Sequence, residues 1–128
     1  MAVSGRVPLD LETELKNQGV SAVLNLTIKP DPQWAFPTMN DGQPDNGMPR
    51  SPDWFQKGVS FALRTIHSGG KVLIHCESGV HRAPSMAYAV LRSMGQNPVQ
   101  AEHTVLAKVP GANVRYKADA EKWLAANG

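Results

Sequence analysis

The stretch Lys71-Val-Leu-Ile-His-Cys-Glu-Ser-Gly-Val-His-Arg-Ala-Pro-Ser85 decides the fold of this chain. It opens with a short run that is apolar at its centre, which is typical of a buried strand. A turn around Gly79 follows, and Pro84 suits the first turn of a helix because the N–H that proline lacks has no partner there. The sequence therefore predicts a strand at 71–76, a loop, and a helix at 83–94.

On both sides of this stretch, helical and strand patterns alternate. We expect helices at 8–18, 51–68, 98–108 and 113–126, a buried strand at 20–27, and at most a short strand around 35–39. This order favours parallel strands with helices packed on the sheet. The sequence thus predicts one α/β domain over residues 1–128, with a small, mostly parallel central sheet flanked by helices.

Between the predicted strand at 20–27 and the helix at 51–68, the chain changes character. Prolines stand at positions 30, 32, 37, 44, 49 and 52. They exclude a long helix or a central strand here. Because a loop of this length in a compact domain usually has a function, we interpret the segment as functional.

Composition excludes several classes of protein. Net charge is +2, from 13 basic and 11 acidic side chains, without a basic stripe. We therefore predict no nucleic-acid partner. No apolar run approaches a membrane span, no leader peptide is visible, and Cys76 is the sole cysteine. We expect a cytoplasmic monomer in a reducing compartment, with no membrane partner.

The loop at 76–82 has the features of an anion site. Successive backbone N–H groups of Glu77, Ser78, Gly79, Val80 and His81 are expected to curl around a bound anion. Gly79 permits a positive φ, and the helix N-terminus adds partial positive charge. Arg82 supplies a planar fork that can hold two oxygens of a phosphate group.

The same positive field acts on the thiol of Cys76. It favours the ionised form, so we expect a thiolate that can attack phosphorus. The competing interpretation is a buried, inert cysteine with a surface arginine six residues later. His75, Cys76 and His81 also suggest a metal site, but a structural zinc needs four ligands and no second Cys/His pair stands nearby. We predict neither a metal nor a cofactor.

His75-Cys76-x5-Arg82 resembles the signature of the protein tyrosine and dual-specificity phosphatases. The resemblance extends from the strand at 20–27 to the helix beginning near Asn113. Within the compact dual-specificity group, Arg82-Ala83-Pro84 and Asn40-Asp41-Gly42-Gln43-Pro44 look most like the phosphatase of regenerating liver branch. The resemblance implies hydrolysis of phosphate monoesters through a phosphocysteine, on a phosphorylated protein or a small phosphate ester. Phosphotyrosine is the expected group, with phosphoserine and phosphothreonine as further candidates.

The resemblance also implies a general acid on the loop upstream of the cysteine, because the leaving oxygen must receive a proton. Asp41 lies in the Asp-Gly-x-Pro match and is our preferred acid, although Asp45 is closer to the usual spacing of the family. Both could also be ordinary turn residues. By the same resemblance, His75 is expected to support the cysteine region through hydrogen bonds.

One position departs from the family pattern. Most relatives have Ser or Thr directly after the arginine, where its hydroxyl helps the thiolate to leave the phosphoenzyme, but this chain has Ala83. We therefore predict a slow second step. This departure also supports an alternative, a low-activity phosphatase-fold module that captures phosphorylated partners. A sulfur-transfer or arsenate-reducing enzyme also uses a reactive cysteine in an anion loop, but a relay of thiols is impossible with one cysteine.

Overall fold

The computed structural model describes residues 1–31 and 34–127. Within them, one sheet has the strand order β1-β4-β2-β3, and all neighbouring strands are parallel. The strands are β1 (Ala2–Ser4), β2 (Val20–Asn25), β3 (Thr38–Asn40) and β4 (Lys71–His75). The predicted α/β fold with a small parallel sheet is therefore confirmed.

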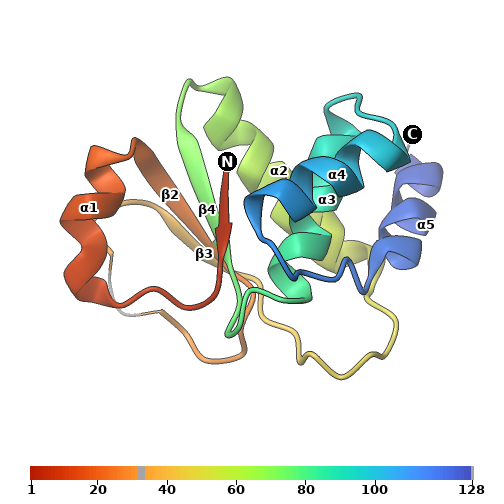
Figure 1. Ribbon diagram of the computed structural model, residues 1–128, viewed down its shortest axis with the longest axis horizontal. Helices are drawn as coiled ribbons and strands as arrows, with labels where there is room; N and C mark the ends of the chain where they lie inside the picture. The colour runs from red at the N-terminus through yellow and green to blue at the C-terminus, as the bar shows by residue number, and fades with distance from the viewer. Residues whose placement is uncertain (32–33, 128) are drawn as a thin grey trace.

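Helices cover both faces of the sheet (Figure 1). They are the 3-10 helix η1 (Leu9–Leu11) and the α-helices α1 (Glu12–Asn17), α2 (Pro52–His67), α3 (Arg82–Ser93), α4 (Pro98–Lys108) and α5 (Lys117–Asn127). Helix α1 lies on one side of the sheet, and α2 to α5 gather on the other. The side chain of Ser51 accepts from the backbone N–H of Trp54, so α2 begins at a conventional N-cap. No helix in the described part of the chain is both long and apolar enough to cross a membrane.

The apolar runs in β2 and β4 are continuous because successive side chains point to opposite faces of the sheet and both faces are buried. Leu24 and Ile74 belong to the large cluster beneath α2 to α5. Val23 and Leu73, one residue earlier in each strand, pack in the smaller cluster on the face of α1. Burial on both faces fixes the register of these strands, and with it the position at which β4 ends.

Some boundaries differ from the prediction. The expected helix at 8–18 divides into η1 and α1, and α5 begins at Lys117 instead of 113. Strand β1 was not predicted, because three residues are too few to show a period. It pairs with β4, Ala2 opposite Leu73, and thereby brings the segment after β1 to the end of β4.

Candidate active site

The 76–82 loop leaves β4 and enters α3 around the sulfur of Cys76. Cys76 is 1% exposed, and its Sγ accepts hydrogen bonds from the backbone N–H groups of Gly79 (3.2 Å) and Ala83 (3.5 Å). Gly79 has φ +75°, and a Cβ there would lie 2.6 Å from the backbone nitrogen of Gly5. Glycine is thus required both by the turn and by the close approach of the N-terminal segment. Donors aimed at sulfur stabilise a thiolate.

Arg82 lies at the start of α3 and is 7% exposed. Its Nη1 donates to the carbonyl oxygens of Leu26 (3.3 Å) and Gln43 (2.8 Å). Its Nε is buried and has no hydrogen-bond partner among the described residues. A buried, unpaired N–H is costly, so this atom is available to an anion that enters the loop.

Asp41 follows β3 directly, and its backbone is fixed on two sides. Its N–H donates to the carbonyl of Asn25 (2.8 Å), and its carbonyl accepts from the indole N–H of Trp54 (2.8 Å). Its Oδ2 is buried without a hydrogen-bond partner in the part of the chain that the structure describes. Burial raises the pKa of Asp41 to about 6, although the positive charge of Lys57 opposes the shift. The carboxyl group can therefore hold a proton close to neutral pH.

Asp45, the competing acid, has different surroundings. It accepts hydrogen bonds from the hydroxyl of Tyr116 (2.7 Å), Nδ1 of His81 (2.8 Å) and Nη1 of Arg115 (3.0 Å). Burial acts to raise the pKa of Asp45, but the hydrogen bonds from Tyr116 and His81, together with the charges of His81 and Arg115, hold the pKa below its usual value. An ionised carboxylate with three donors is a structural tie between loops and a poor source of protons.

The 41–50 loop is anchored by Arg50, which is 6% exposed. Its guanidinium donates to the carbonyl oxygens of Pro44 (2.7 Å) and Met48 (2.9 Å) and to Oδ1 of Asn46 (2.9 Å). It also stacks over the ring of Tyr116, 4.8 Å from the centroid. These contacts join both ends of the 41–50 loop to each other and to Tyr116.

Ala83 is fully buried, and the nearby serine does not replace the hydroxyl that this position lacks. The hydroxyl of Ser85 donates to the carbonyl of His81 (2.7 Å) and accepts from the N–H of Tyr116 (3.0 Å). The first contact lies within the first turn of α3, and the second joins α3 to the segment before α5. The expected slow second step stays a prediction with this structural support.

The remaining predicted residues of the loop lie around the same turn. Ser78 Oγ accepts from the N–H of Val80 (3.4 Å), and the carbonyl of Val80 accepts from the N–H of Asn113 (2.8 Å). The side chain of Glu77 points outward to Arg6, which sequence reasoning did not include (2.8 Å). Among the described residues, no group of three His, Cys, Asp or Glu could hold a metal ion.

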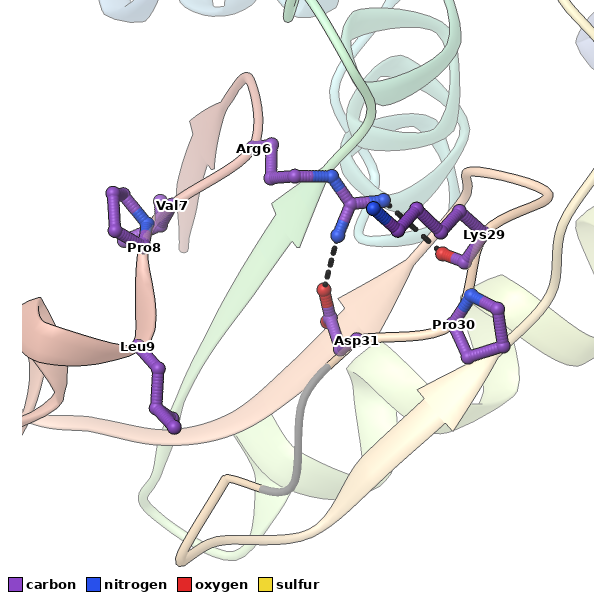
Figure 2. Close-up of a pocket in the computed structure, with 7 residues that line it drawn as sticks. All are labelled: Arg6, Val7, Pro8, Leu9, Lys29, Pro30 and Asp31. Atoms are coloured by element: carbon purple, nitrogen blue, oxygen red, sulfur yellow. Dashed lines mark hydrogen bonds and ion pairs between the residues drawn. The ribbon is translucent and has the colours of Figure 1, made fainter.

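Sequence reasoning also missed Asp31, which lies 2.7 Å from Nε2 of His75. Asp31 is 44 residues away from His75, so no local pattern could have revealed the pair. A pocket of about 680 Å³ lies beside this pair, lined by the residues drawn in Figure 2: Arg6, Val7, Pro8, Leu9, Lys29, Pro30 and Asp31. Through Arg6, the pocket adjoins Glu77 of the 76–82 loop.

Comparisons with known proteins agree with this geometry. Dual specificity protein phosphatase 2 of Mus musculus is 33% identical over 75 residues, which are 57% of this chain and 24% of that protein. Dual specificity protein phosphatase 5 of Rattus norvegicus is 43% identical over 42 residues, 33% of this chain and 11% of that protein. The chain thus spans about a quarter or less of the length of these relatives. No protein-family model matches it.

Solved structures match over nearly the whole chain. Human DUSP28 has a TM-score of 0.87 at 18% identity, covering 99% of this chain and 94% of that one. PTPMT1 has a TM-score of 0.83 at 16% identity, covering 98% and 94%. The chain therefore has the fold of the cysteine-based dual-specificity phosphatase superfamily. In sequence it is similar to dual specificity protein phosphatases 2 and 5, and the resemblance to the regenerating-liver branch stays a prediction.

Proposed function

We propose that this protein is a phosphatase that hydrolyses phosphate monoesters through a phosphocysteine at Cys76. The observation that supports this most is the cradle around Sγ, with two backbone N–H groups facing the sulfur and the unpaired Nε of Arg82 buried at the start of the adjoining helix. Such a site binds an oxyanion and favours the thiolate at the same time. An inert cysteine requires neither feature.

The reaction has two steps. In the first, the Cys76 thiolate attacks phosphorus, the P–O bond to the leaving group breaks, and protonated Asp41 gives its proton to the departing oxygen. In the second, ionised Asp41 accepts a proton from water, the water oxygen attacks phosphorus, and the thiolate leaves. Arg82 and the backbone N–H groups of the 76–82 loop bind the phosphoryl oxygens throughout.

The substrate is a phosphorylated protein or a small phosphate ester, with phosphotyrosine as the first candidate. Groups next to the phosphate would meet the pocket beside Glu77, with apolar walls from Val7, Pro8 and Leu9 and the exposed Lys29. A related solved structure is PTPMT1 in complex with PI(5)P. We therefore include a phosphoinositide among the substrates to assay. We also propose that the chain acts as a cytoplasmic monomer with residues 1–128 as one catalytic domain.

Turnover of an aryl phosphate tests the proposal. We expect the wild type to release phosphate, and Cys76→Ser and Arg82→Lys to lose nearly all turnover. Asp10 is exposed and lies far along the chain from the 76–82 loop. Asp10→Asn is therefore the matched control and should keep full activity. A wild type without turnover, or a Cys76→Ser variant that retains it, contradicts the proposed function.

The role of Asp41 is tested with a series of leaving groups. For an aryl phosphate with a basic leaving group, Asp41→Asn should lower kcat by about 100-fold, because protonation of the leaving oxygen is then required. For a good leaving group the loss should be small. Because the donor must be protonated, the wild-type rate with the poor leaving group should decline as pH rises through about 6. An equal loss for all leaving groups would contradict this assignment.

A second candidate function is a low-activity module that captures phosphorylated partners, and the buried Ala83 is the observation that favours it. One similar solved structure is a human tyrosine phosphatase-like serine/threonine/tyrosine-interacting protein, with a TM-score of 0.75 at 19% identity. Tight binding of a phosphopeptide by the wild type without any turnover would support the module.

A further inference from the structure

A line of hydrogen bonds runs behind the 76–82 loop from Arg6 through Asp31 to His75. Nη1 of Arg6 donates to Oδ1 of Asp31 (3.2 Å), the contact drawn in Figure 2. Oδ2 of the same carboxylate lies 2.7 Å from Nε2 of His75. The side chains of Asp31 and His75 are 1% and 0% exposed. Each oxygen of this buried carboxylate therefore has its own donor, as a buried charge requires.

The other ring nitrogen of His75 faces the backbone of the candidate nucleophile. Nδ1 lies 3.4 Å from the carbonyl oxygen of Cys76. Because Asp31 and the Cys76 carbonyl are both acceptors, the ring must carry a hydrogen on each nitrogen to bond to both, and the short bond to Asp31 sets its orientation. His75 thus acts on the position of the Cys76 backbone, whereas the sulfur receives its hydrogen bonds from the loop.

Arg6 joins this line to the 76–82 loop itself. Its Nε and Nη2 both donate to Oε1 of Glu77 (3.0 and 2.8 Å), and its backbone N–H donates to the carbonyl of Glu77 (3.0 Å). One planar guanidinium therefore contacts the carboxylates of Glu77 and Asp31 at once through three nitrogens in a fixed geometry, which the single ammonium nitrogen of a lysine does not reproduce. The neighbouring Gly5 approaches so closely that a Cβ would lie 2.7 Å from the Glu77 carbonyl oxygen.

We propose that Asp31 and Arg6 are positioning residues for the Cys76 chemistry. Asp31 orients His75 against the Cys76 carbonyl, and Arg6 fixes Asp31 to Glu77 of the loop, so that the sulfur and the backbone donors keep their relative geometry. The inference rests on the proposed phosphatase function for its effect on rate. The rate depends on this geometry because small misplacements of reacting atoms cost large factors in turnover.

Nuclear magnetic resonance tests the arrangement without any need for catalysis. Cys76 is the sole cysteine, so labelling cysteine with carbonyl ¹³C gives one signal, and ¹⁵N-histidine reports the His75 ring. We expect the wild-type His75 Nε2–H proton at low field, as for a strong bond to a carboxylate. Asp31→Asn should move it upfield and shift the Cys76 carbonyl signal, whereas Asp10→Asn should leave both in place. Unchanged signals in Asp31→Asn overturn the proposal.

Kinetics with a chromogenic aryl phosphate give the second test. We expect kcat of Asp31→Asn and of Arg6→Lys to fall about tenfold, with KM changed less than twofold. Thermal unfolding of the same samples shows whether each variant is folded. Arg6 is partly exposed, so Arg6→Lys keeps the test open if Asp31→Asn does not fold. An unchanged kcat in folded Arg6→Lys overturns the positioning role. An inactive wild type contradicts the proposed function alone, and the resonance measurements then decide the inference.

Discussion

At the scale of single residues, the two aspartates of the 41–50 loop differ in what holds them. Asp41 has a buried oxygen without a hydrogen-bond partner among the described residues, and Asp45 has three donors. The chain thus separates a carboxyl group that can carry a proton from one that stays ionised. In the sequence, the Asp-Gly-x-Pro match favours Asp41 and the spacing favours Asp45, and neither signal contains information about burial.

Burial of Asp41 should cost stability. Its folded-state pKa of about 6 exceeds the ordinary value of 3.8. The protonated carboxyl therefore contributes fully to the free energy of unfolding below pH 3.8, and this contribution is lost as pH rises through 6. At pH 7.5, the free energy of unfolding measured with urea should therefore be higher for Asp41→Asn than for wild type. The expected difference is ~1 kcal/mol after allowance for solvent screening. The difference should vanish near pH 4. A variant less stable than wild type at pH 7.5 would count against this environment.

Ala83 leads to a prediction about the second step. In Ala83→Ser, the new hydroxyl at the start of α3 can stabilise the departing thiolate, so hydrolysis of the phosphocysteine should accelerate. We expect stopped-flow measurements to show a burst in the wild type, and a smaller burst with a several-fold higher kcat in Ala83→Ser. Identical burst amplitudes and kcat values would show that the missing hydroxyl does not limit turnover.

At the scale of elements, the 41–50 loop is tied to the 76–82 loop by the pair of Asp45 and His81. Asp45→Asn should destabilise the fold by ~1 kcal/mol at pH 7, because the carboxylate loses its charge-assisted bonds. The pKa of Asp45 is lowered in the folded state, so its contribution is present above pH 3.8 and is lost as pH falls below it.

Urea unfolding at pH 7 and pH 3 measures this contribution. The difference in free energy of unfolding between wild type and Asp45→Asn should be smaller at pH 3. Asp10→Asn should have the same free energy of unfolding as wild type at both pH values. If this difference is as large at pH 3 as at pH 7, it comes from packing and not from the ionised carboxylate. We also expect kcat to fall several-fold in Asp45→Asn as the loop loosens.

Elements with strong end signals were predicted well. Helix α4 begins at Pro98 and ends at Lys108, as expected, and its start is fixed by a reciprocal capping box between the N-cap Asn97 and Gln100 in the first turn. Strand β1 was missed, since it is recognisable only by its pairing with β4. The expected start of α5 was early, because the segment from Asn113 is held by the carbonyl of Val80 and other distant contacts before the helix begins.

At the scale of the whole molecule, the site joins segments that are distant in sequence. The 76–82 loop was predictable because its donors, Arg82 and Cys76 are contiguous. The partners of the loop were not, since Arg6 reaches Glu77 across 71 residues and Arg82 reaches Gln43 across 39. Only the assembled sheet brings these segments together, because its parallel strands place the carboxyl ends of β1, β2 and β4 at the same end of the sheet.

Because an anion in the loop would bind these segments together, phosphate should stabilise the entire fold. At 100 times its Kd, we expect a gain of about 2.7 kcal/mol in unfolding free energy, a rise in Tm of roughly 10 °C. Thermal unfolding of Cys76→Ser should show a similar rise, and Arg82→Lys should lose most of it, because lysine lacks the planar fork that binds two oxygens in a fixed geometry. Equal shifts in Arg82→Lys and wild type would place the anion elsewhere.

The most direct measurement is to trap the covalent intermediate. Wild-type protein mixed with an aryl phosphate is quenched in acid during the burst, digested, and examined by mass spectrometry. We predict one phosphoryl group on the peptide that contains Cys76, attached through sulfur and missing in Cys76→Ser. Turnover of the substrate with no adduct on Cys76, or with the adduct on another residue, would contradict the central claim.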